Sequence, residues 1–115
     1  MTETEAEGWI QMVPGIRRRT IAAGERMMQM LVVLERGAHL PEHRHPHEQL
    51  THVLRGRLRF SIAGEPRELG PGESVCLAGG TPHAADALEE TLVVDTFSPP
   101  REDLLAEDAV KNKAS

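Results

Sequence analysis

GAHLPEHRHPHEQLTHVLRG, residues 37–56, contains five of the six histidines of this 115-residue chain. His43 and His45 are two residues apart, which in a strand places both imidazoles on one face with Cα atoms about 6.6 Å apart. Two imidazoles on one face can chelate one metal ion. Gln49 has the same parity and an acceptable amide oxygen, but Pro46 interrupts the strand, so parity alone does not fix its direction.

A further ligand has to come from another part of the chain, because a lone His-x-His pair also occurs in polar surface strands. His83 is the only histidine outside residues 37–56, and it follows Thr81-Pro82 at a predicted turn. His39, His47 and His52 are weaker candidates. His39 precedes the pair, His47 follows a proline that redirects the chain, and His52 has the opposite parity.

The residues around this stretch predict an all-β fold. Short apolar runs alternate with glycine and proline turns, a pattern typical of a sandwich or barrel. Pro99-Pro100 blocks a strand and can open a helix, so a helix is expected over Arg101–Val110. The predicted strands are Met27–Glu35, Gln49–Arg55, Arg57–Ile62, Ser74–Leu77 and Thr91–Phe97.

Two of these strands predict a contact with a second subunit. Met27–Leu34 is apolar on both alternating faces, so we expect both faces to be covered. If Gln49 points into the barrel, Leu50 and Leu54 point outward. Outward leucines beside other outward apolar positions favour a homodimer.

Length and charge restrict the remaining possibilities. The chain is long enough for one domain, which we divide into a disordered segment (1–7), a barrel (8–103), and a short helix with a tail (104–115). The formal net charge of −5 argues against nucleic-acid binding. The polar, acidic start resembles no signal peptide and no apolar run could span a membrane, so we expect a cytoplasmic protein.

The single cysteine and a run of three arginines allow two further predictions. With one cysteine the chain cannot form an internal disulfide, and Cys76 is expected to be a small buried residue. Arg17, Arg18 and Arg19 are interpreted as a solvated strand edge.

Two motifs at full spacing resemble the cupin family. The first runs from Gly37 through His43, His45 and Gln49 to Gly56, with glutamine in place of the usual glutamate. The second has Gly72, Ala78, Gly80 and His83, with Ala78 in place of the usual proline. The resemblance covers roughly Trp9 to Asp103. It implies a double-stranded β-helix, or jelly-roll barrel, that holds one divalent metal ion through His43, His45, Gln49 and His83.

Two segments are similar to the KdgF-type pectin-degradation cupins. They are residues 41–49, PEHRHPHEQ, and residues 95–103, DTFSPPRED. Members of that family hold a metal through three histidines and a glutamine and open the ring of 4,5-unsaturated uronates. The resemblance implies functional roles for Asp95, Phe97 and Arg101.

The chemistry of these residues suits a small anionic ligand. Three neutral imidazoles and an amide leave the +2 charge of an ion uncompensated, so the site should attract anions and polarise a bound oxygen. Asp95 could move a proton, Phe97 could pack on the sugar, and Arg101 could hold its carboxylate. Each residue also has a structural alternative. Asp95 could be the partner of an arginine, Phe97 could be an ordinary core residue, and Arg101 could lie in a surface helix. Residues 84–90 are expected to form a small, acidic loop.

Other functions and several metals remain open. The alternatives are a metal-dependent dioxygenase or polyketide-cyclase-like cupin, and a non-catalytic cupin that binds a small molecule. Gln49 removes the carboxylate that two-His-one-carboxylate iron oxygenases use, although a three-histidine iron site stays possible. The donor set is compatible with Zn, Ni, Mn, Fe, Cu or Co.

Overall fold

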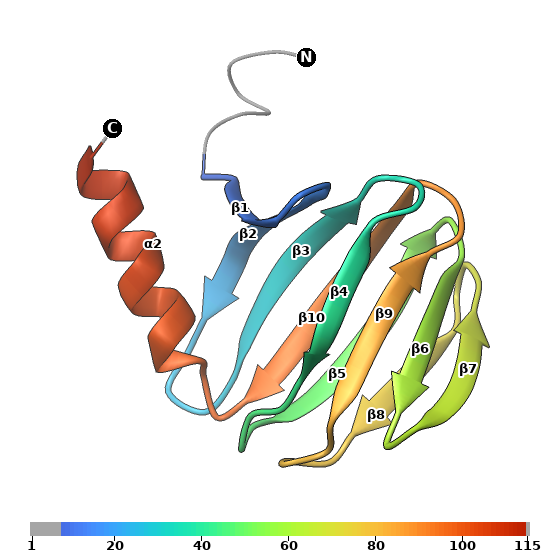
Figure 1. The fold of residues 1–115 in the computed structure, drawn as a ribbon. Helices are drawn as coiled ribbons and strands as arrows, with labels where there is room; N and C mark the ends of the chain where they lie inside the picture. The colour runs from blue at the N-terminus through green and yellow to red at the C-terminus, as the bar shows by residue number, and fades with distance from the viewer. Residues whose placement is uncertain (1–7, 115) are drawn as a thin grey trace.

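The structure is a computed structural model that describes the backbone of residues 8–114 and the side chains of residues 8–111. The expected disorder of residues 1–7 concerns residues outside this part. Within it, ten strands precede one helix (Figure 1). They are β1 (Ile10–Val13), β2 (Ile16–Ala23), β3 (Met28–Leu34), β4 (His39–His43), β5 (Glu48–Arg55), β6 (Leu58–Ile62), β7 (Glu65–Leu69), β8 (Ser74–Leu77), β9 (His83–Ala87), β10 (Thr91–Ser98) and α2 (Glu102–Ala114).

The strands form two antiparallel sheets that enclose the core. The larger sheet has the order β1-β2-β3-β10-β5-β8 and the smaller one β4-β9-β6-β7. Figure 1 shows the sheets facing each other, with α2 beside the β2–β3 end. Inward side chains alternate with outward ones, as in β10, where every second residue from Thr91 to Phe97 is buried. The predicted all-β barrel with a short C-terminal helix is therefore confirmed.

Five strands match the predicted ones to within one residue at each end, and α2 begins one residue later than expected and runs beyond Val110. The strands that were not predicted, β1, β2, β4, β7 and β9, are short or polar. β7 has the sequence EPREL with one buried residue, and β9 has the sequence HAADA without a β-branched side chain. Pairing with neighbouring strands, rather than intrinsic preference, sets these segments.

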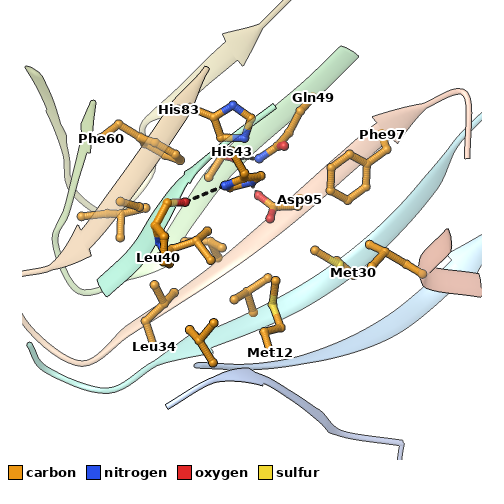
Figure 2. A pocket seen from close by; sticks show the side chains of 18 of the residues that line it. Met12, Met30, Leu34, Leu40, His43, Gln49, Phe60, His83, Asp95 and Phe97 are labelled. Atoms are coloured by element: carbon orange, nitrogen blue, oxygen red, sulfur yellow. Dashed lines mark hydrogen bonds between the residues drawn. The ribbon is translucent and has the colours of Figure 1, made fainter. Parts of the chain in front are cut away.

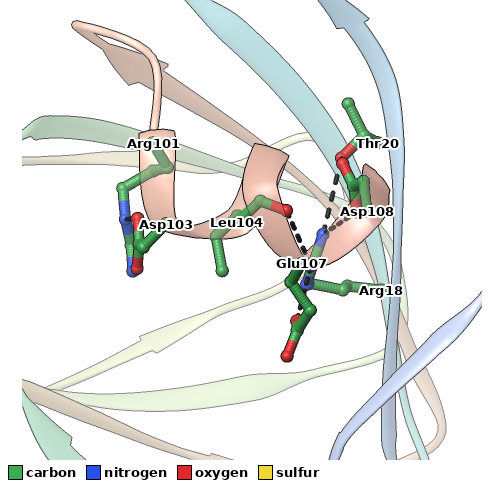
Figure 3. A network of polar contacts seen from close by, with 7 residues as sticks. All are labelled: Arg18, Thr20, Arg101, Asp103, Leu104, Glu107 and Asp108. Atoms are coloured by element: carbon green, nitrogen blue, oxygen red, sulfur yellow. Dashed lines mark hydrogen bonds and ion pairs between the residues drawn. The ribbon is translucent and has the colours of Figure 1, made fainter. Parts of the chain in front are cut away.

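The prediction that Arg17, Arg18 and Arg19 form a solvated strand edge is wrong for Arg18, because this residue is 0% exposed. Its guanidinium donates to Glu107 Oε1 at 2.7 Å, to Asp108 Oδ1 at 2.9 Å and to the Leu104 carbonyl oxygen at 3.3 Å (Figure 3). The Thr20 hydroxyl donates to the second Asp108 oxygen at 2.6 Å. We call Arg18, Thr20, Glu107 and Asp108 the helix anchor. A buried arginine requires such partners, and here they fix α2 against β2.

The outer face of the larger sheet is apolar. Leu50 and Leu54 point outward as predicted and are 47% and 45% exposed. Half-buried side chains lie on the neighbouring strands β3 and β10, at Leu31, Val33, Leu92 and Val94. Both faces of β3 were expected to be covered, and within this chain the inner one is buried. Cys76 also lies on the outer face and is exposed, which corrects the prediction that it is buried.

Within residues 8–114, no helix has the length and apolar character needed to cross a membrane.

Candidate metal site

A cavity of about 300 Å³ lies between the two sheets, and the predicted site residues gather at one end of it (Figure 2). His43, Gln49, His83, Asp95, Phe97 and Arg101 all line the cavity. They come from β4, β5, β9, β10 and the residue before α2. His45 does not line it but lies behind, with its ring 5.6 Å from that of Phe97.

Three histidines converge at this end. His43, His45 and His83 each offer a ring nitrogen, and these nitrogens lie within 4.8 Å of one another. His43 and His83 are partners in the β4–β9 ladder. Their Nδ1 atoms contact the carbonyl oxygens of Pro41 and Thr81 at 2.9 and 2.8 Å. Because a carbonyl only accepts, both Nδ1 atoms carry the hydrogen, which leaves each Nε2 as the atom with a lone pair.

His45 reaches the cluster from a turn, which corrects the expectation that it shares a strand with His43. β4 ends at His43, and His45 follows just before Pro46. The Gly80 N–H donates to the His45 carbonyl oxygen at 2.7 Å. A Cβ atom at Gly79 would overlap the Pro46 carbonyl oxygen, so the approach of these two turns requires glycine there. The second motif thus holds the first in place.

Gln49 points inward, and its amide is oriented by a chain of hydrogen bonds. Gln49 Nε2 donates to Thr51 Oγ1 at 2.9 Å, and the Thr51 hydroxyl donates to Asp95 Oδ1 at 2.6 Å. The Gln49 Oε1 is thereby directed toward His45 Nε2, from which it accepts a hydrogen bond at 3.0 Å. This separation of 3.0 Å between the two atoms is similar to the separation of two ligand atoms that each lie about 2.1 Å from one metal ion.

Burial favours the neutral form of His45 and His83. It lowers the pKa of His45 to about 4, and the positive charge of Arg101 acts in the same direction. Burial also lowers the pKa of His83. A neutral imidazole has a lone pair for a metal ion, whereas an imidazolium does not.

Asp95 is the buried carboxylate of the cavity. Burial raises its pKa to about 6, against the opposing effects of the Thr51 and Gln49 hydrogen bonds and the charge of Arg101. Asp95 faces inward on β10, as does Phe97 two residues later. Asp95 therefore lies beside the histidine cluster with a pKa close to neutrality, which suits a group that exchanges protons.

Arg101 lies over Phe97, with its guanidinium carbon 5.1 Å from the ring centroid. The guanidinium also forms two hydrogen bonds with the exposed Asp103, at 3.0 and 2.8 Å. The Arg101 side chain is mostly buried and lines the cavity. This position places a positive charge at the same end as the histidines.

Comparison with known proteins agrees with the fold and the motifs. Residues 30–96 match the family model for the cupin domain. The chain belongs to the cupin family. This cupin is 33% identical over 99 residues to the pectin degradation protein KdgF of Dickeya dadantii (strain 3937), which covers 84% of this chain and 90% of that protein.

Two further relatives extend the comparison. The structure of KdgF from Halomonas sp. superposes with a TM-score of 0.81 at 36% identity, covering 87% of the cupin and 93% of that chain. The dimethylsulfoniopropionate lyase DddQ of Ruegeria pomeroyi is 36% identical over 63 residues, which is 54% of this chain and 31% of that protein. The resemblance to KdgF-type cupins is thus confirmed.

The donor set of the cupin fits a divalent transition metal. Among the described residues, four buried side-chain nitrogens have no hydrogen-bond partner: Arg18 Nε, His45 Nδ1, His47 Nδ1 and His83 Nε2. A buried polar atom without a partner is costly, and a metal ion would satisfy His83 Nε2, which faces the cluster. Together, the three imidazoles and the Gln49 oxygen form a neutral set of ligands.

His39 and His52 lie outside this cluster, whereas His47 is not one of its three ligand residues but has its ring 5.4 Å from that of His45. His39 is exposed and paired with Asp86 at 2.8 Å, and the half-buried His52 contacts Ser74. The expected acidic loop at residues 84–90 is wrong for its first part, because β9 continues to Ala87. Asp86 points outward toward His39, so it does not face the cavity.

Thr51 is a site residue that the sequence analysis did not assign. The available signal was its parity, because Thr51 shares the inward face with Gln49. Parity places a hydroxyl beside the amide but does not identify Asp95 as the partner on another strand. That contact depends on the β5–β10 register, in which Asp95 pairs with Thr51.

Proposed function

We propose that this cupin is a metal-dependent enzyme that opens or isomerises a small anionic sugar acid of the unsaturated uronate type. The observation that carries the proposal is the convergence of three histidines and the Gln49 oxygen at the end of the cavity that Asp95 and Arg101 line. The similarity to KdgF over most of the chain supports the same activity.

In this proposal one divalent ion (Zn, Ni, Mn, Fe, Cu or Co) is held by His43, His45, Gln49 and His83. When bound, the ion would act as a Lewis acid toward a substrate oxygen. The neutral ligands leave its charge uncompensated, which favours an anionic substrate. Gln49 also takes the place of the carboxylate that two-His-one-carboxylate oxygenases use, which favours this proposal over a dioxygenase.

Asp95 is assigned the proton transfer. Of the described residues that line the cavity, two are carboxylates, Glu42 and Asp95, and only Asp95 is buried. The Thr51 hydroxyl bond holds the Asp95 carboxyl in position beside the histidines. With a pKa of about 6, Asp95 can both take up and return a proton near neutral pH.

Arg101 and Phe97 are assigned to substrate binding. A guanidinium matches a carboxylate in shape and charge and can bind it through two parallel hydrogen bonds. The ion pair with Asp103 occupies the same donors, so the substrate carboxylate would replace that exposed partner. Phe97 would present its ring to the apolar face of the sugar.

The test is turnover of an unsaturated uronate by protein loaded with each candidate metal. Its double bond, conjugated with the carboxylate, absorbs ultraviolet light, and this absorbance disappears when the ring opens to a keto acid. We expect the metal-loaded protein to accelerate the loss of absorbance. If no metal gives a rate above that of the metal-free protein, the proposed activity is wrong.

We also propose that the cupin forms a homodimer through the outer face of the larger sheet. Leu50 and Leu54 are exposed there, beside half-buried apolar residues on β3 and β10. Light scattering should give twice the chain mass, and Leu50→Asp with Leu54→Asp should give a monomer. Val110→Asp, at an exposed position on α2, is the control and should leave the mass unchanged.

A further inference from the structure

The cavity extends beyond the metal site into a region lined by aliphatic and aromatic side chains (Figure 2). We call this region the apolar lobe, and its walls come from β3, β6, β9 and β10. Its residues are Val32, Leu34, Leu58, Phe60, Ala85 and Val93.

The strand registers place the lobe directly behind the polar groups. Along β10 the inward residues are Phe97, Asp95 and then Val93, and Val93 pairs with Val32 of β3. On the opposite sheet the inward neighbour of His83 is Ala85, which pairs with Phe60. The polar lining therefore ends at the level of Asp95, and the next level is hydrocarbon on both sheets.

The lobe differs from an ordinary core because it borders open space. Protein interiors are close-packed and rarely contain voids larger than a water molecule, whereas this cavity measures about 300 Å³ in all. Met12, Leu40 and Leu104 line the cavity and are only partly buried. The wall that reaches solvent beside the lobe is thus apolar as well. Water against such a wall lacks hydrogen-bond partners, so hydrocarbon displaces it readily.

We propose that the cavity binds small amphiphilic anions, with a carboxylate at the Arg101 and histidine end and a short hydrocarbon chain or ring in the apolar lobe. The charge of Arg101 selects the carboxylate, and the lobe selects the hydrocarbon. This inference goes beyond the proposed function. A uronate needs hydrogen-bond partners for its hydroxyl groups and would use only the polar end.

The test is the affinity of a series of unbranched carboxylates, namely acetate, butanoate, hexanoate and octanoate. Calorimetry on the protein with and without Zn²⁺ gives the dependence on chain length in each state. We expect the affinity to rise about fourfold for each methylene group that enters the lobe, and to level off once the lobe is full. An affinity that does not change with chain length would overturn the inference.

A matched pair of substitutions on β9 locates the effect. Ala85 points into the lobe and is 2% exposed, whereas its neighbour Ala84 points to the other face and pairs with Ser61. Ala85→Leu should remove the dependence on chain length and leave acetate binding unchanged. Ala84→Leu should keep the dependence. An unaltered dependence in Ala85→Leu would place the hydrocarbon elsewhere and contradict the inference.

If Ala85→Leu does not fold, Val32→Thr replaces it. Threonine has nearly the shape of valine but brings a hydroxyl group into the lobe. Hexanoate should then bind several-fold more weakly while acetate binds as before. Equal binding of hexanoate to both forms would contradict the inference.

The carboxylate-binding experiment and the uronate-turnover experiment test the two proposals separately. A dependence on chain length without uronate turnover would refute the enzymatic proposal and support the lobe. Turnover with a flat carboxylate series would support the enzymatic proposal and refute the lobe.

Discussion

The two ends of the cavity are built on different principles. At the polar end, hydrogen bonds orient several of the side chains: His43 and His83 contact backbone carbonyls, Gln49 donates to Thr51, and Thr51 donates to Asp95. In the apolar lobe, side chains contribute shape and area, and one aliphatic group can replace another at modest cost. Substitutions at the polar end should therefore change chemistry, whereas those in the lobe should change which ligand binds.

The segment made up of Arg101 and α2 contributes side chains to both ends of the cavity. Arg101, just before α2, lines the cavity at the polar end, and Leu104 of α2 lines the wall beside the apolar lobe. The helix anchor holds α2 in this position through the buried Arg18 (Figure 3). The two ends are thus independent in their chemistry but share a support.

The largest effect should follow from removing a histidine of the cluster. His83→Ala or His43→Ala should reduce the bound metal from about one equivalent per chain to near zero, and uronate turnover should fall to background. Elemental analysis of protein purified without added metal gives the content. His39→Ala removes an exposed histidine of the same strand as His43 and should retain the metal. Metal retained after both cluster substitutions would refute the site.

The next largest effect is expected from Asp95→Asn. The amide keeps the shape but cannot take up a proton, so turnover should fall by about 10²–10⁴-fold while the metal content stays the same. Glu42→Gln alters the other, exposed carboxylate of the cavity and should have little effect. Equal losses in both variants would mean that turnover depends on the charge of the cavity rather than on Asp95.

A smaller effect should follow from Thr51→Val, which keeps the shape of the side chain and removes its hydroxyl group. Gln49 Nε2 then loses its acceptor, and the amide is no longer held with Oε1 toward His45. We expect metal affinity to weaken about 10–100-fold, measured by competition with a chelator. Thr51→Ser keeps the hydroxyl and should restore most of the affinity. An affinity unchanged in Thr51→Val would show that Gln49 needs no such support.

The same contrast explains how much could be predicted from the sequence. His43, His45, Gln49 and His83 lie in two motifs whose spacing is visible along the chain, and the apolar strands have a clear pattern. By contrast, the apolar lobe combines side chains from four strands, and only the registers of both sheets bring Val93, Val32 and Phe60 to one level. No local pattern marks residues that are core in one part of a strand and cavity wall in another.

Arg18 illustrates a second limit of sequence analysis. In the run Arg17-Arg18-Arg19 the three side chains are equivalent as a pattern, yet Arg18 is fully buried and meets two carboxylates about ninety residues later in the chain. The strand β2 turns Arg18 inward by alternation, and α2 supplies Glu107 and Asp108 at the same place. Such a pairing between distant segments requires the fold, so composition alone favoured a solvated edge.

The smallest effect on ligand binding is expected from loosening the helix anchor, and it tests whether the two ends share a support. Glu107→Gln with Asp108→Asn leaves the Arg18 charge buried without a counter-ion, which should destabilise the fold by about 3 kcal/mol in denaturant unfolding. Arg18→Met removes the buried charge itself, and the carboxylates can then turn to solvent. Arg18→Met should lower the free energy of unfolding less than the double variant does, because a buried charge without a counter-ion is more destabilising than no buried charge.

Ligand binding in the folded Arg18→Met variant then separates shared support from independent ends. If α2 is displaced, Arg101 and Leu104 move together, so acetate should bind a few-fold more weakly and the gain per methylene group should also decrease. Glu102→Gln, at the exposed start of α2 and outside the anchor, is the control and should change neither. A loss confined to acetate would mean that α2 supports only the polar end. In that case the apolar lobe would depend on the two sheets alone.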